Sequence, residues 1–500
     1  MIQTFRIARL RWLPMVVLLA SSPAFAHDGP DHDHPPVKVP DATAYRPTAI
    51  PDRILLTWTG DTAYTQAVTW RTDDSVHKPI AQVALASAAP KFTEKAAEVK
   101  ATTRKLETNL GTALYHTAVF GDLKPSTLYA YRVGDGVNWS EWFHFRTAND
   151  KAEPFSFIYF GDAQNDIKSL WSRVIRGAYS DIPNSKFIIH AGDLVNRGDN
   201  DAEWGEWHGA GGWVNGMVPS IPTPGNHEYP RPTILNDSEA KAWAETRLKL
   251  EEEAKAANKP FDAKAAFEKF GPKPRLTSHW AATFALPDNG PEGLKSSVYY
   301  VDYQGTRIIS LNSNERRQEQ VAWLDQTLSH NPSRWTVITF HHPVYSAAKN
   351  RDNKELRDLW QPVFDKYKVD IVLTGHDHTY ARSGLRVYDN LPTGTNARDG
   401  ESGTVYVVSV SGPKMYNLDK EPWMKRAAED TQLYQTISID GDRLIYQAKT
   451  ATGELYDAFD LLKRDGQPNQ LVEKAPKTPE KLRIPQKPAD APKVPAAAAR

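Results

Sequence analysis

The fold of this 500-residue chain is decided by residues 187–198, which read FIIHAGDLVNRG. The apolar run that opens this stretch ends within a few residues at Gly192-Asp193. Uninterrupted apolar runs are typical of strands buried on both faces of a sheet. Polar residues at the carboxyl ends of such strands lie where α/β proteins build their sites. The stretch therefore predicts a buried strand that carries Asp193 to a functional edge.

The same pattern recurs along the chain after Pro154. Apolar runs at 155–160, 337–340 and 369–373 end in Gly161-Asp162, His341 and Gly375-His376, and a further turn reads Gly225-Asn226-His227. Stretches 318–328 and 354–367 between these runs have helical character. We therefore expect an α/β domain over residues 152–465, with 232–270 as an Ala-, Glu- and Lys-rich helical insertion that either covers the site or is a solvated excursion.

The polar residues at these strand ends suit a metal site. Carboxylate, amide and imidazole groups are ligands for borderline divalent or trivalent metals, and the chain contains no cysteine that could supply a thiolate. Glycine at positions 161, 192, 225 and 375 lets the backbone turn sharply beside a candidate ligand. The candidate residues are Asp162, Asp193, Asn226, His227, His341, His376 and His378.

Residues 44–148 have a different pattern. Short runs of alternating apolar and polar residues, separated by turns such as Gly134-Asp135-Gly136, predict an antiparallel β-sandwich. Residues 123–133 resemble fibronectin type III domains, in which a tyrosine at this corner hydrogen-bonds back to the backbone. Nothing here gathers catalytic groups, so this domain is expected to be a scaffold.

The two ends of the chain predict export and disorder. Basic residues, a short apolar run and Ala24-Phe25-Ala26 indicate a signal peptide over residues 1–26, cleaved after Ala26, and hence a periplasmic or secreted protein. Residues 27–43 and 466–500 are expected to be a disordered leader and a disordered tail. Lys plus Arg equals Asp plus Glu, 61 each, so no charge excess indicates nucleic acid or an anionic membrane as a partner.

Five motif blocks, taken in order, resemble those of calcineurin-like metallophosphoesterases. They are Gly161-Asp162, Gly192-Asp193, Gly225-Asn226-His227-Glu228, His341-His342-Pro343 and Gly375-His376-Asp377-His378. With the preceding sandwich, the chain resembles purple acid phosphatases of the bacterial branch over nearly all of residues 44–465. The resemblance implies a four-layer domain of two sheets flanked by helices, following the fibronectin III-like domain.

The resemblance also implies roles for single residues. Asp193 would bridge two metal ions, Asp162 and His378 would complete the first site, and Asn226, His341 and His376 would complete the second. His227 would face the substrate, either protonating the leaving oxygen or binding the phosphoryl group. Two such cations generate hydroxide from a bound water and neutralise the phosphoryl oxygens.

Two positions depart from the family. Asn196 stands where purple acid phosphatases carry the tyrosine that binds ferric iron, and Gln164 stands where related enzymes carry a histidine ligand. Either amide would be a weak ligand, so we expect a colourless protein. The expected metals are two divalent or mixed-valence ions of Fe, Zn or Mn.

The expected activity is hydrolysis of small phosphate monoesters by a metal-bound hydroxide. A phosphodiesterase with the same site and a non-catalytic protein that binds phosphate ligands are the alternatives. Arg197 follows Asp193 as a candidate substrate clamp, or else as an ion-pair partner of Asp199 or Asp201. The sequence does not indicate an oligomeric state.

Overall fold

The computed structural model describes residues 37–232, 234–235, 237–388 and 402–483. The predicted sandwich is present as two four-stranded antiparallel sheets, ordered β1-β2-β6-β5 and β4-β3-β7-β8. Their core includes Trp70 and Tyr131, both fully buried. The expected tyrosine corner is formed by Tyr129, whose hydroxyl accepts a hydrogen bond from the backbone N–H of Lys124 (2.9 Å). The strands are β1 Asp52–Thr57, β2 Gln66–Thr72, β3 Ile80–Leu85, β4 Ala97–Lys100, β5 Thr102–Thr108, β6 Gly111–Phe120, β7 Leu128–Gly134 and β8 Phe143–Arg146.

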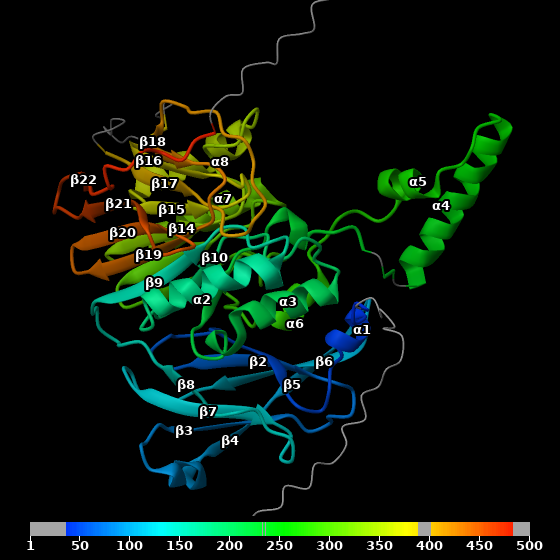
Figure 1. The fold of residues 1–500 in the computed structure, drawn as a ribbon, viewed down its shortest axis with the longest axis horizontal. Coiled ribbons are helices and arrows are strands. Elements are labelled where there is room, and N and C mark those ends of the chain that lie inside the picture. Colours follow the sequence, from blue (N-terminus) through cyan, green and yellow to red (C-terminus); the bar gives the residue numbers. More distant parts are fainter. Residues whose placement is uncertain (1–36, 233, 236, 389–401, 484–500) are drawn as a thin grey trace, which may run out of the picture. The chain divides into compact units, whose positions relative to one another are not determined.

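The following α/β domain contains two seven-stranded sheets (Figure 1). The first has the order β11-β10-β9-β19-β20-β21-β22 and the second β12-β13-β14-β15-β17-β16-β18. The strands of the first sheet are β9 Phe155–Phe160, β10 Ile188–His190, β11 Ser220–Pro222, β19 Leu433–Asp440, β20 Arg443–Thr450, β21 Leu455–Leu462 and β22 Gln470–Glu473. Those of the second are β12 Tyr299–Tyr303, β13 Thr306–Ser310, β14 Trp335–Thr339, β15 Ile371–Thr374, β16 Tyr380–Arg386, β17 Thr404–Val408 and β18 Met424–Ala428.

Three apolar clusters hold these sheets in a four-layer arrangement. One cluster joins the inner faces of the two sheets, for example Tyr159 and Ile189 with Val337 and Leu373. A second packs helices α2 Ser172–Asp181 and α3 Asp201–Gly211 on β9 and β10. A third packs α7 Arg317–Ser329 and α8 Lys354–Tyr367 on the second sheet. The predicted four-layer domain is therefore confirmed, and its central sheets are buried on both faces, as their continuous apolar runs require.

Parallel pairing brings the motif blocks to one edge. Strands β9, β10 and β11 are mutually parallel neighbours, as are β13, β14, β15 and β17. Because the carboxyl ends of parallel strands share an edge, the residues that follow β9, β10, β11, β14 and β15 meet there. The fold thus converts blocks that are far apart in the sequence into one cluster.

A buried ion-pair network joins the sandwich to helix α3. Arg53 of β1 donates to both carboxylate oxygens of Asp201 (2.7 and 2.8 Å), and Arg71 of β2 donates to the same group (3.2 Å). His279, in α6 Ser278–Thr283, lies 3.2 Å from it. These side chains are at most 3% exposed. The sandwich and the α/β domain lie within one compact unit, Asp41–Arg500.

The predicted disorder at both ends needs correction. Residues 41–43 belong to the short helix α1 Asp41–Ala44, and strand β22 lies inside the predicted tail. Arg382 pairs with Glu473 of β22 (2.8 Å) and with buried Asp457, which anchors this strand to both sheets. Local composition gave no sign of this long-range pairing. The predicted signal peptide, and residues 27–36 and 484–500, lie outside the described residues.

The predicted insertion is helical, with α4 Asp237–Ala256 and α5 Ala263–Phe270. Neither helix contains a buried residue, which is the pattern of a solvated excursion. Among the residues that the structure describes, no helix combines the length and apolarity needed to span a bilayer.

Candidate metal centre

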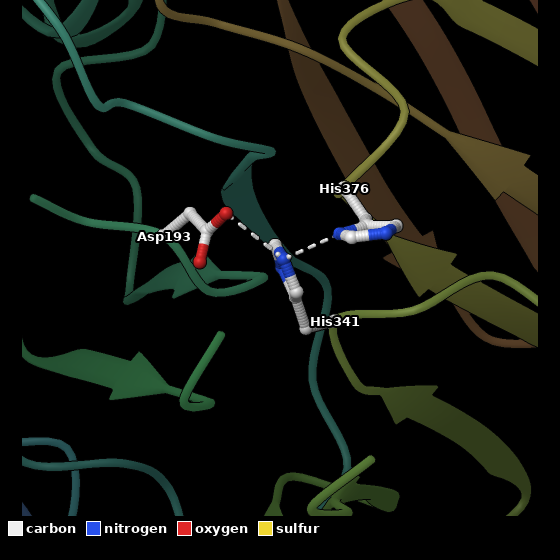
Figure 2. A group of neighbouring side chains, drawn as sticks. All are labelled: Asp193, His341 and His376. Atoms are coloured by element: carbon white, nitrogen blue, oxygen red, sulfur yellow. Dashed lines mark hydrogen bonds and ion pairs between the residues drawn. The ribbon is translucent and has the colours of Figure 1, made fainter. Parts of the chain in front are cut away.

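Two overlapping groups of side chains meet at the shared sheet edge. One consists of Asp193, His341 and His376 (Figure 2), and the other of Asp162, Asp193 and His378. Within each group the possible ligand atoms all lie within 4.8 Å of one another. Asp193 belongs to both groups, so its carboxylate lies where one residue can serve two neighbouring cations.

In the first group, His341 lies between a carboxylate oxygen of Asp193 and a ring nitrogen of His376. Its Nε2 is 3.1 Å from Asp193 Oδ2 and 3.2 Å from His376 Nδ1, as the dashed lines in Figure 2 show. Asn226 Oδ1 approaches the same nitrogen to 3.1 Å. On its other side, His341 Nδ1 donates to the carbonyl of Ala191 (2.9 Å). That bond leaves the lone pair of Nε2 directed at the carboxylate when the ring is neutral.

In the second group, the histidine is oriented in the same way, by a hydrogen bond from Nδ1 to a backbone carbonyl. His378 Nδ1 donates to the carbonyl of Lys414 (2.9 Å), and Nε2 faces Asp162 Oδ2 at 3.2 Å. Gln164 is fully buried; its Nε2 donates to Asp193 Oδ2 (3.3 Å) and lies 2.8 Å from His378 Nε2. Asp162 Oδ2 and Gln164 Oε1 are buried and accept no hydrogen bond from the described part of the chain.

The contacts around His341 fit a cation. The lone pairs of His341 Nε2, Asp193 Oδ2 and Asn226 Oδ1 face one another and repel unless a positive charge lies between them. In the metal-free protein a proton supplies that charge: despite burial, the carboxylates of Asp193 and Asp162 raise the pKa of His341 to about 10. Burial also raises the pKa of Asp162 to about 7. Divalent metals bound at the same atoms would replace these protons.

The backbone around the ligands is held in an uncommon conformation. Asp193, His376 and His378 have φ values of 49°, 73° and 45°, in the left-handed region that non-glycine residues seldom adopt. At Gly375 a Cβ atom would lie 2.2 Å from Asp162 Oδ1, so only glycine fits beside this ligand. Such conformations are typical of sites whose geometry the surrounding fold enforces.

Glu228 holds the loop backbone around the candidate ligands in place, a role that was not predicted from the sequence. Its buried carboxylate accepts hydrogen bonds from the backbone N–H groups of Asp193 (2.9 Å), Leu194 (2.9 Å) and Gly225 (2.7 Å). It thereby fixes the turns after β10 and β11 relative to each other. Its position directly after Asn226-His227 in a motif block was the available signal.

The remaining candidates lie around the centre in different settings. His227 is 25% exposed, with Nδ1 hydrogen-bonded to the carbonyl of Asn196 and Nε2 3.9 Å from Asp193 Oδ2. Asn196 is half-buried. Arg197 is 58% exposed and pairs with Asp199 at 3.3 Å, the ion-pair alternative that the sequence left open. Asp377 points away from the ligands and accepts hydrogen bonds from Ser346 and Ala347.

Comparison with known proteins agrees with this geometry. The model of the purple acid phosphatase N-terminal domain matches residues 51–147, and that of calcineurin-like phosphoesterases matches residues 119–380. The second match covers more than half of the chain. The chain belongs to the calcineurin-like phosphoesterases.

Curated relatives of this phosphoesterase carry purple acid phosphatase names. The Arabidopsis thaliana protein "Probable purple acid phosphatase 20" is 26% identical over 54% of this chain and 56% of its own length. "Probable inactive purple acid phosphatase 1" from the same plant is 23% identical over 70% and 57%. The chain spans between 53% and 66% of the length of the curated relatives it matches.

A solved structure shows the same fold. Purple acid phosphatase from yellow lupin (Lupinus luteus) seeds superposes with a TM-score of 0.64, at 17% identity, and the match covers 82% of this phosphoesterase and 74% of the lupin chain. The predicted combination of a sandwich with a metallophosphoesterase domain is therefore confirmed.

Replacing Gln164 with alanine is expected to weaken metal binding at the Asp162–His378 group by about 10- to 100-fold, because the buried carboxamide that contacts both Asp193 and His378 is lost. Titration of metal-free protein with Mn²⁺ or Zn²⁺ by calorimetry measures this directly. Gln164→Glu, which keeps an oxygen at this position, is the matched comparison and should retain binding. Equal affinities for wild type and Gln164→Ala would show that the amide is not a ligand.

Proposed function

We propose that this protein hydrolyses phosphate monoesters at two metal ions that share Asp193. The observation that carries the proposal is that Asp193 belongs to two groups of converging side chains, one with His341 and His376 and the other with Asp162 and His378. Asp162, Gln164 and His378 would hold one ion, and Asn226, His341 and His376 the other. The ions would be Fe, Zn or Mn, and the protein would be colourless because Asn196 replaces the tyrosine of purple enzymes.

Two such ions, when bound, supply a nucleophilic water at neutral pH and neutralise the charge of the phosphoryl group. The protein's own residues would hold the two ions at a fixed separation and supply a proton to the leaving group. Asp193 and its neighbours Gly192 and Glu228 hold the two ligand groups at a fixed separation. His227 Nδ1 donates to the carbonyl of Asn196, so Nε2 lies on the partly exposed side. When the ring carries a second proton on Nε2, that proton would pass to the leaving oxygen or hydrogen-bond the phosphoryl group.

The two alternatives have less support. A phosphodiesterase would use the same ligands, and the centre by itself does not distinguish the two esters. A non-catalytic protein would be expected to have lost ligands, whereas the Asp, Asn and His ligands named above converge here. The signal peptide supports a further proposal, that the enzyme acts on phosphate esters outside the cytoplasm.

Hydrolysis of p-nitrophenyl phosphate and bis-p-nitrophenyl phosphate, with Mn²⁺, Zn²⁺ or Fe²⁺ supplied to metal-free protein, tests the proposal. We expect metal-dependent turnover of the monoester, abolished by chelation and restored by metal. Faster turnover of the diester would favour the phosphodiesterase. No turnover of either ester with any of the metals would leave the binding protein as the better account.

A further inference from the structure

Positive side chains border the metal centre on the side of His376 and His378. Arg351 Nη1 donates to the carbonyl of His376 and to Asp377 Oδ1, both at 3.3 Å. Asp377 in turn binds Ser346 and the backbone N–H of Ala347, which holds this loop against the metal ligands. The guanidinium group of Arg351 is therefore fixed beside the centre rather than free in solvent.

A tyrosine ring joins Arg351 to a second cation. The ring of Tyr416 packs 4.6 Å from the ring of His378, and its backbone N–H donates to the carbonyl of His378 (3.1 Å). Arg351 Cζ lies 4.8 Å and Lys414 Nζ 5.5 Å from the centre of the Tyr416 ring. Lys414 is also the residue whose carbonyl orients His378. One aromatic ring next to a metal ligand thus gathers two positive charges.

These two cations have unused binding capacity. Lys414 is half-buried, and no carboxylate of the described residues lies within ion-pair distance of its ammonium group. Arg351 is 36% exposed, and its Nε and Nη2 donate no hydrogen bond within the described part of the chain. Neighbouring cations are otherwise occupied, since Arg197 pairs with Asp199 and Lys349 with Asp419. Two like charges held together at a partly buried position favour an anion between them.

We propose that Arg351 and Lys414 form a subsite for the terminal oxygens of a doubly charged phosphoryl group, so that the enzyme selects phosphate monoesters over diesters. The inference rests on the proposed function and names the side chains that would set the preference for monoesters. A monoester presents two negative charges near neutral pH, and a diester presents one. Charge-assisted hydrogen bonds from a guanidinium or ammonium group stabilise the additional charge. Inorganic phosphate, the product, carries the same terminal oxygens and would bind the same subsite.

The test compares Arg351→Met and Lys414→Met with Lys349→Met, a matched removal of a cation that points to Asp419 instead. For each metal-loaded variant, kcat/KM is measured for p-nitrophenyl phosphate and its bis ester. Calorimetry then gives the affinity for inorganic phosphate and for singly charged dimethyl phosphate. We expect Arg351→Met and Lys414→Met each to lose about 10- to 100-fold for the monoester and for phosphate. The diester and dimethyl phosphate should change only a few-fold, with Lys349→Met close to wild type.

Arg351→Lys keeps the charge and should recover part of the loss. Equal losses for both esters, or lower metal content by mass spectrometry, would mean that Arg351 and Lys414 only support the ligand loops, and the inference would fall. Unchanged phosphate affinity in both methionine variants would overturn it as well. A wild-type protein that turns over neither ester instead contradicts the proposed function, while its phosphate binding still reports on the subsite.

Discussion

Asp193→Asn is expected to lower kcat/KM for a phosphate monoester by about three orders of magnitude or more, the largest catalytic effect of any single replacement in this protein. The carboxylate is shared by both ligand groups, within 3.1 Å of His341 and 3.3 Å of Gln164. An amide keeps the shape but removes the negative charge that would hold two cations close together. Loss of several kcal/mol of charge stabilisation corresponds to a rate effect of this size.

The measurement is steady-state hydrolysis of p-nitrophenyl phosphate alongside metal content. Asp325→Asn removes a half-exposed carboxylate that pairs with Lys366 between α7 and α8, and it should behave as wild type. If Asp193→Asn kept full metal content and more than about a tenth of wild-type activity, Asp193 would not be the bridging residue.

Asp201→Asn is expected to cause the largest loss of stability. Its carboxylate, 2% exposed, accepts hydrogen bonds from Arg53 and Arg71 and lies beside His279. Removing the negative charge leaves two buried guanidinium groups without their shared partner. Breaking a buried ion pair from one side costs about 3–5 kcal/mol. We therefore expect a clearly lower denaturant midpoint and melting temperature.

Asp442→Asn breaks a surface pair with Arg334, in which both side chains are more than 40% exposed, and should cost at most about 1 kcal/mol. Similar midpoints for the two variants would show that the Arg53–Asp201 network does not stabilise the junction between the sandwich and α3.

The same network predicts how stability depends on pH. Burial disfavours the Asp201 carboxylate, but His279 and Arg53 outweigh it and hold its pKa below the usual value. A group with a lowered folded-state pKa stabilises the fold above its unfolded pKa, about 3.9, and loses that contribution as the pH falls through the folded value. The stability difference between wild type and Asp201→Asn should therefore be constant from about pH 5 to 8 and shrink below about pH 4.

The sequence predicted those helices and strands that have a continuous apolar run or a helical periodicity of their own. The apolar run 155–160 is strand β9, and the helical stretch 354–367 is helix α8, with the same limits. Strand β22 was missed because it is held by pairing with β21 and by an ion pair with Arg382, about ninety residues earlier in the chain. Pairing across such distances leaves no trace in local composition.

Part of the candidate metal centre could be predicted from the sequence, because its motif residues directly follow predicted strands. Parallel pairing placed Asp162, Asp193, His341, His376 and His378 together, as expected for strand ends that share an edge. The roles of Glu228, Lys414 and Tyr416 could not be read from the sequence, because each depends on a backbone or ring contact that only the folded chain creates. In the sequence alone, nothing distinguishes these three residues from other Glu, Lys and Tyr residues of the chain.

The most direct test of the account is the metal content of the protein. Metal-free chain loaded with Mn²⁺ or Zn²⁺, dialysed, and measured by inductively coupled plasma mass spectrometry should contain close to two ions per chain, and Asp193→Asn at most one. A wild-type protein that binds no metal, or binds a single ion that Asp193→Asn does not affect, would contradict a dinuclear centre bridged by this carboxylate.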